Sequence, residues 1–178
     1  MSENYYKFIE IIKEKNIKIT KVCAGQKLLI EKSLYFDVLW PNSNKVINEN
    51  ILNNNSLVLK MIYKNFSILF TADIEKLAEG EILKLHKNNL EIFKSTILKI
   101  AHHGSKTSTT EKFLQVTKPK YALIGVGEDN KFGHPNEEII NRLNSKNIKI
   151  YRTDIMGEIE IRIRNTIKIK PFLYKINS

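Results

Sequence analysis

The residues best suited to chemistry in this sequence are two adjacent histidines, His102 and His103, that follow a short apolar run at 97–101. The run predicts a buried strand, and Gly104 with the hydroxyl-rich residues 105–108 predicts a turn directly after it. Loops at strand ends are where α/β proteins usually carry their functional groups. Imidazoles held there can bind a metal, transfer a proton or contact a phosphate. A polar turn that merely contains histidines is the alternative, but the adjacency of the pair favours function.

Two other polar groups also follow predicted strands, namely Asp73 and His134. If these strands lie beside the strand before His102 and point the same way, their ends meet at one edge of the sheet. A carboxylate and imidazoles at such an edge are plausible ligands for Zn²⁺ or Mn²⁺. Two other readings stay open, because Asp73 could instead cap the helix that starts near Glu75, and His134 could be a simple turn residue.

Apolar periodicity places these groups on alternating strands and helices. Helices are predicted at 3–15, 75–87, 109–116 and 136–145, with Ser108 or Thr110 and then Asn136 as N-caps of the last two. Strands are predicted at 17–22, 27–30, 35–40, 56–63, 66–70, 97–101, 121–126, 148–151, 158–164 and 166–170. The Asn-rich stretch 41–55 is predicted to be a polar loop, and His86 to be solvated on its helix. Residues 1–178 are therefore expected to form a single α/β layered domain.

The composition is that of an ordinary globular protein, with 178 residues of which 42% are hydrophobic. A single cysteine, Cys23, excludes an internal disulfide and a zinc site built from cysteines, and we expect it to be buried. The net charge of +10 favours a polyanionic partner, although the lysines are spread along the chain. There is no signal peptide pattern and no apolar run of transmembrane length, so the chain as it stands is expected in the cytoplasm.

Residues 54–157 resemble the C-terminal half of the metallo-β-lactamase-fold domain of the ComEC family of DNA internalization competence proteins. The matching pieces are residues 54–59, 68–75, 98–108, 133–135 and 151–154, with weaker similarity at 25–40 and in the last hairpin. A His-His-Gly-Ser block followed at this distance by Gly-His-Pro is specific, whereas neither would be alone.

The resemblance implies a four-layered αββα sandwich with two divalent metal ions, Zn or Mn, at its edge. It implies that Asp73 bridges both ions and that one histidine of the pair, for which we favour His103, ligates the second. His102 and His134 are then catalytic, and the implied contacts to the substrate are Ser105, Lys106, Thr107 and Ser108. The implied reaction is hydrolysis of a DNA phosphodiester, with the ions neutralising charge on the transition state.

The sequence departs from the family pattern in its first half. The family's His-x-His/Asp-x-Asp-His motif is absent, because the four histidines lie at 86, 102, 103 and 134. One carboxylate and one imidazole are too few ligands for a tightly held two-metal site. We therefore expect a partial metallo-β-lactamase sandwich, mainly its C-terminal half, that is inactive alone and has an exposed apolar face. Ala72 stands where the family usually has glycine, which is tolerated unless the turn needs a positive φ.

Three functions are compatible with these features. The first is a metal-dependent hydrolase domain of a DNA-uptake protein, completed by a partner chain that supplies the missing half. The second is a non-catalytic half-domain that binds DNA or a partner chain through its basic surface. The third is an inactive truncated remnant. The resemblance also implies a parent protein in the bacterial cell membrane, with this domain outside it.

Overall fold

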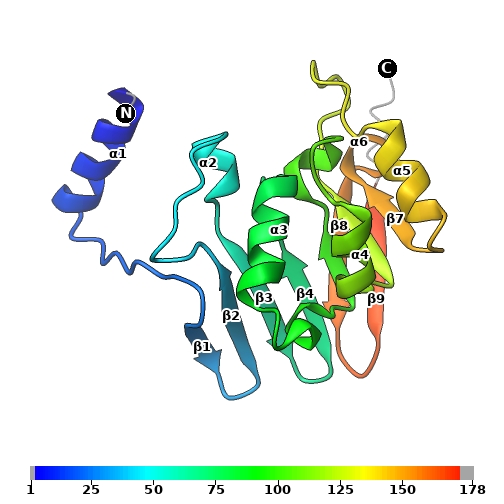
Figure 1. Ribbon diagram of the computed structural model, residues 1–178, viewed down its shortest axis with the longest axis horizontal. Coiled ribbons are helices and arrows are strands. Elements are labelled where there is room, and N and C mark those ends of the chain that lie inside the picture. Colours follow the sequence, from blue (N-terminus) through cyan, green and yellow to red (C-terminus); the bar gives the residue numbers. More distant parts are fainter. Residues whose placement is uncertain (1–2, 173–178) are drawn as a thin grey trace.

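A seven-stranded sheet covered by helices on one face forms the body of the protein (Figure 1). The structure is a computed structural model that describes residues 3–172. The strands of the large sheet follow chain order: β1 (Lys27–Glu31), β2 (Leu34–Trp40), β3 (Val58–Tyr63), β4 (Phe66–Phe70), β5 (Ile97–Lys99), β6 (Tyr121–Ile124) and β7 (Lys149–Arg152). A separate hairpin consists of β8 (Glu158–Ile163) and β9 (Ile167–Phe172).

The pairing of neighbouring strands changes from antiparallel to parallel at β4. Strands β1 to β4 pair antiparallel, and β3 and β4 are joined by a tight turn at residues 64–65. Strands β4 to β7 pair parallel, because each connection runs through a helix: α3 (Lys76–Leu85), α4 (Glu111–Thr117) and α5 (Glu137–Asn144). Figure 1 shows these three helices on the same face of the sheet. The carboxyl ends of β4, β5 and β6 therefore meet at one edge.

The remaining helices are short or peripheral. They are α1 (Glu3–Glu14), α2 (Ile51–Asn54) and α6 (Thr153–Met156), with 3₁₀ turns η1 (Leu90–Phe93) and η2 (Ala101–Gly104). Helix α1 stands apart from the body in Figure 1, and most of its large apolar side chains are exposed. No helix within residues 3–172 is long and apolar enough to cross a membrane.

The main core lies between the sheet and its helices. Leu69 and Leu98 from neighbouring strands pack with Ile82 of α3 and Phe113 of α4, and all four are almost fully buried. Trp40 closes this core at the end of β2, where its indole N–H donates to the carbonyl of Asn54 at 2.8 Å. The apolar bodies of these residues stabilise the fold, and the one polar group among them is satisfied.

The opposite face of the sheet is also apolar, but only part of it is open. Ile68, Ile97 and Tyr151 are buried there, on the side where Figure 1 places the β8–β9 hairpin. Phe70, on the same face, is 36% exposed. Exposed apolar surface, as expected from the sequence, is therefore present in part: around Phe70, and on the edge strand β1, where Leu29 and Ile30 are 70% and 62% exposed.

The sequence predicted the class correctly, as an α/β layered fold, and located most of the elements. Thr110 and Asn136 cap α4 and α5 as predicted, accepting from the backbone N–H groups of Phe113 and Glu138. The strand predicted at 17–22 is wrong, because that segment has no regular secondary structure and pairs with no strand among the described residues. Two short helices, α2 and α6, were not predicted, and Cys23 is half-buried rather than buried.

A buried carboxylate joins α3 to the start of α4. Glu79 is 1% exposed and accepts hydrogen bonds from the backbone N–H groups of Thr109 and Thr110. The guanidinium of Arg142 lies on the other side of this segment and donates to the carbonyl of Thr109 at 2.7 Å. Burial raises the pKa of the Glu79 carboxyl, although these hydrogen bonds and Arg142 oppose the shift.

We predict that Glu79→Gln changes how stability depends on pH. The pKa of Glu79 is higher in the folded protein than its ordinary value of 4.5. The protonated carboxyl therefore contributes to the free energy of unfolding fully below pH 4.5, and this contribution is lost as the pH rises through the folded-state pKa. The free energy of unfolding of the wild type minus that of E79Q should therefore fall with rising pH in urea titrations. Glu81→Gln is the matched control, because hydrogen bonding to Lys45 lowers the pKa of Glu81 and reverses the sign. A flat difference for E79Q would contradict the prediction.

Candidate functional site

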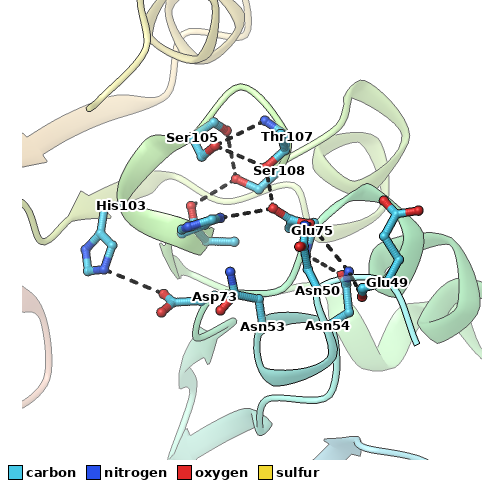
Figure 2. Close-up of polar contacts among 12 residues, drawn as sticks. Glu49, Asn50, Asn53, Asn54, Asp73, Glu75, His103, Ser105, Thr107 and Ser108 are labelled. Atoms are coloured by element: carbon cyan, nitrogen blue, oxygen red, sulfur yellow. Dashed lines mark hydrogen bonds and ion pairs between the residues drawn. The ribbon is translucent and has the colours of Figure 1, made fainter. Parts of the chain in front are cut away.

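Three strand ends bring the predicted residues together at one edge of the sheet, where Figure 2 shows His103 facing Asp73. Asp73 follows β4, the histidine pair follows β5, and His134 lies on the loop that follows β6. The Nε2 atom of His103 is 3.7 Å from Oδ1 of Asp73, and the rings of His102 and His134 lie 5.7 Å apart, centre to centre. Residues separated by 61 positions in sequence thus form one cluster.

Asp73 and His103 are residue types that can hold a metal ion, and they face each other at this edge. Nδ1 of His103 lies 2.5 Å from the carbonyl oxygen of Gly125, so it carries the proton and donates. The lone pair on Nε2 then faces the Asp73 carboxylate, as in metal sites where a backbone carbonyl orients the histidine. Asp73 does not cap α3, whose N-cap position is occupied by Glu75. Both side chains are nearly half exposed, at 48% for His103 and 41% for Asp73.

These two donors fit a divalent ion in type and direction, but they are only part of a ligand set. Within residues 3–172 no group of three histidine, cysteine or acidic side chains is close enough to hold a metal. A firmly held zinc ion has at least three protein ligands. Asp73 and His103 alone are therefore too few to hold such an ion firmly.

The histidine turn owes its shape to three consecutive left-handed residues. The φ angles are 48° at His102, 54° at His103 and 83° at Gly104. A positive φ costs an L-residue about 1–2 kcal/mol, so the turn needs compensating contacts. The N–H of His102 donates to the carbonyl of Ala72 at 3.0 Å, and its own carbonyl accepts from Ser105 at 2.8 Å. These bonds tie the turn to the residue beside Asp73.

Glu75 lies beneath the turn and is almost fully buried. Its carboxylate accepts from the side chains of Asn50 at 2.7 Å and Thr107 at 2.9 Å. One of its oxygens is 3.4 Å from Nδ1 of His102. Burial acts to raise the pKa of Glu75, but the hydrogen bonds from Asn50, Thr107 and Asn54, together with His102, outweigh it and the pKa is lowered. Glu75 therefore carries its negative charge next to His102 at neutral pH.

The hydroxyl groups after the histidines are used mainly within their own loop. Ser108 is buried and donates to the carbonyls of Ala101 and Ser105. Ser105 is also buried and contacts the Thr107 hydroxyl at 3.0 Å. Of the four residues proposed from sequence as substrate contacts, Lys106 is the one whose side chain is exposed.

His134 approaches this cluster from the loop after β6. Its Nδ1 is buried and has no hydrogen-bond partner within the described residues. Burial lowers the pKa of His134, and the neighbouring imidazoles of His102 and His103 lower it further. A neutral imidazole with an unused nitrogen can accept or donate a proton at this position.

Some residues of the site were missed by sequence reasoning. Glu75 and Asn54 form its buried floor, and the exposed Asn50 donates to Glu75. Their signal in the sequence was a glutamate two residues after Asp73 and an Asn-rich stretch. Lys99 was also missed. Burial lowers the pKa of the Lys99 ammonium, while the Asp73 carboxylate opposes this shift.

His86 lies outside the site, and the prediction that it is solvated was wrong. Its Nε2 is 3.1 Å from the carbonyl of Leu39, and its ring packs edge-on against Phe93. It is a structural residue at the end of α3.

The sequence is similar to segments of longer bacterial proteins, among them competence proteins. ComE operon protein 3 of Bacillus subtilis (strain 168) is 36% identical over 161 residues, which are 90% of this chain and 20% of the relative. Competence protein ComA of Neisseria gonorrhoeae is 33% identical over 138 residues, 78% of this chain and 19% of the relative. Recombination protein 2 of Haemophilus influenzae is 29% identical over 135 residues, 73% of this chain and 15% of the relative.

This chain is related to one segment of the ComEC-family competence proteins. It spans about a fifth of the length of the first two relatives. No protein-family model matches the sequence.

The departure from the ComEC pattern at Ala72 has a cost in this structure. Ala72 has φ 46°, so the turn before Asp73 does use the left-handed conformation that glycine adopts freely. The strain lies directly beside a candidate metal ligand, and the N–H of His102 donates to this residue.

We predict that Ala72→Gly stabilises the protein by about 0.5–1 kcal/mol. Relief of the left-handed strain is worth about 1–2 kcal/mol, and the added freedom of the unfolded chain cancels part of it. Ala24→Gly is the control, because Ala24 is a loop residue without a positive φ and should lose stability. Urea unfolding of both variants tests this, and a loss of stability in A72G would refute it.

We also predict that Gly104→Ala destabilises the protein by about 2–4 kcal/mol, from backbone strain and overpacking together. An added Cβ would lie 2.6 Å from Cβ and 3.1 Å from Cα of Pro135. Gly80→Ala in α3, where an added Cβ meets nothing within 4 Å, should instead stabilise by about 0.5–1 kcal/mol. The measurement is the thermal midpoint of each variant, and equal midpoints for G104A and wild type would contradict the close contact.

Proposed function

We propose that this chain contributes half of a two-metal hydrolase centre in a DNA-uptake protein, and that the bond broken is a DNA phosphodiester. The observation that carries the proposal is the 3.7 Å approach of His103 to Asp73 at the ends of parallel strands. The names of the relatives, two of which are competence proteins, supply the biological setting.

Asp73 and His103 are the residues that would hold the ions, Zn or Mn, with the remaining ligands contributed by a segment outside this chain. Divalent ions in such a centre polarise a phosphoryl oxygen and lower the pKa of water. The ring of His103 is held for this purpose by the Gly125 carbonyl, and both side chains reach solvent.

The other residues act on the substrate directly. The Nδ1 atom of His102 lies 3.4 Å from the Glu75 carboxylate, and this imidazole is placed to hydrogen-bond to a phosphoryl oxygen. The pKa of His134 is lowered, so its imidazole is neutral beside His102 and can accept a proton. Lys106 extends from the same turn into solvent, where its ammonium can meet the next phosphate.

DNA is the substrate favoured by charge. The chain carries 29 basic and 19 acidic residues, a net charge of +10. Such an excess attracts polyanions through Coulomb attraction and counterion release.

A second candidate, a non-catalytic half-domain that binds DNA or a partner chain, is favoured by the incomplete ligand set among the described residues. It predicts binding to DNA without metal and with an affinity that falls steeply with salt. It also predicts that Asp73→Asn leaves this binding unchanged.

Cleavage of a labelled single-stranded DNA in Mn²⁺ or Zn²⁺ tests the first candidate. We expect no cleavage by the chain alone, and cleavage once a purified segment carrying the His-x-Asp-x-Asp-His motif is added. Asp73→Asn and His103→Ala should then reduce the cleavage rate by more than about 100-fold. Loss of a residue that only hydrogen-bonds to a metal ligand costs about 10–100-fold, and loss of the ligand itself should cost more. Asp37→Asn, which alters a carboxylate paired with Lys27 on the sheet, is the control and should retain activity.

Metal binding can be followed separately in the chain alone. Paramagnetic Mn²⁺ should broaden the ring signals of His103 far more than those of His86, which lies at the other end of α3. Equal broadening of the two, or complemented protein that binds Mn²⁺ without cleaving DNA, would overturn the hydrolase proposal.

A further inference from the structure

Phe132 projects into solvent beside the candidate site. It is 81% exposed, although large aromatic side chains are usually at least partly covered. One face of its ring stacks on His134, with the ring centres 5.9 Å apart and the planes 22° from parallel. Its exposure leaves the other face open to a ligand.

The loop that carries Phe132 is held by its own hydrogen bonds. The side-chain oxygen of Asn130 accepts from the backbone N–H groups of Phe132 at 3.3 Å and His134 at 2.9 Å. The Asn130 amide donates to the carbonyls of Gly127 and His134. The aromatic ring is therefore presented by a preorganised loop, which reduces the entropy lost on binding.

A hollow connects this ring to the candidate metal ligand. A cavity of about 190 Å³ is lined by His103, Val126, Gly127, Asn130, Phe132 and His134. Ligand pockets for drug-sized molecules start at about 300 Å³, so this one accommodates a small group rather than a whole ligand. A nucleotide whose base lies against Phe132 would have its sugar and phosphate at the His103 side.

We propose that the open face of Phe132 is a stacking platform for one unpaired base of a DNA strand, next to the phosphate that reaches the Asp73–His103 edge. This inference rests on DNA being the substrate, as proposed above. It adds that the substrate is single-stranded at this point, because the base faces of a duplex are already stacked on each other.

The surroundings of Phe132 favour a nucleic acid over a protein partner. Lys131 is its neighbour and is exposed, and the histidines of the site lie on its inner side. An exposed aromatic ring beside an exposed lysine is a pairing that single-strand binding proteins use, with a base stacked on the ring and a phosphate on the cation. A protein interface would instead present a contiguous apolar patch, and neither Lys131 nor Gly133 beside Phe132 extends one.

The test uses the whole chain without metal, in EDTA, so that binding is measured apart from cleavage. The probe is a short single-stranded DNA that carries 2-aminopurine, whose fluorescence is quenched when it stacks on an aromatic ring. We expect Phe132→Ala to abolish the quenching and to weaken binding roughly 5- to 150-fold, the range that corresponds to loss of one base–aromatic stack. Phe132→Trp should restore both, and Phe132→Leu should restore neither.

Three controls make the result specific. Phe8→Ala removes an exposed phenylalanine from α1, away from the site, and should bind like wild type. A strand of equal length with an abasic residue at the probe position should bind equally to wild type and F132A. Duplex DNA should also bind equally to both, because its bases cannot reach the ring.

The outcomes separate this inference from the proposed function. Quenching that depends on Phe132, in a protein that cleaves no DNA when complemented, would support the platform and reject the hydrolase. Cleavage that depends on Asp73, with binding and quenching unchanged in F132A, would overturn the platform alone. Loss of binding to a complementing protein segment, with DNA binding intact, would assign Phe132 to a protein interface and overturn it as well.

Discussion

The buried carboxylate of Glu75 is the interaction on which the geometry of this edge depends. It accepts hydrogen bonds from the loop before β3 and from the turn after β5, through Asn50 and Thr107, while its own backbone N–H is bonded to Asn54. A buried charge is tolerated only when it is paired and hydrogen-bonded, so each of these segments is held at a fixed distance from the others. The imidazole of His102 lies within that arrangement.

The site combines a rigid base with an open rim. Beneath the turn the polar groups are buried and paired, as for Ser108 and Glu79. At the rim Asp73 and His103 reach solvent, where an ion or a phosphate can approach without displacing protein atoms. The strained backbone at His102 and His103 is maintained because the surrounding hydrogen bonds hold it in the left-handed conformation.

The sequence was sufficient to locate what depends on local pattern. The strand before His102 was visible as an apolar run, and the helices between the parallel strands followed from periodicity, so the meeting of Asp73, the histidine pair and His134 could be predicted from chain order. The site's floor could not be predicted in this way, because Glu75 meets Asn50 and Thr107 across 25 and 32 residues of sequence.

The errors have physical causes of the same kind. The alternation at residues 17–22 is typical of a strand, but a strand also needs a neighbour to pair with, and the first edge of the sheet is taken by β1. His86 was taken for a solvated residue because its helix is rich in lysine, whereas a carbonyl 47 positions away decides its environment. The sequence pattern indicates which secondary structure a segment favours by itself, but not which residues it contacts in the folded protein.

The contact between Gly104 and Pro135 has a consequence for the spacing of the two loops at this edge. Because the two loops interlock at van der Waals distance, and the N–H of Asn136 also donates to Gly104, neither can shift without carrying the other along. The spacing between the imidazoles on the two loops is thus fixed by backbone packing, whereas the outer tip of the second loop, where Phe132 lies, is outside this contact.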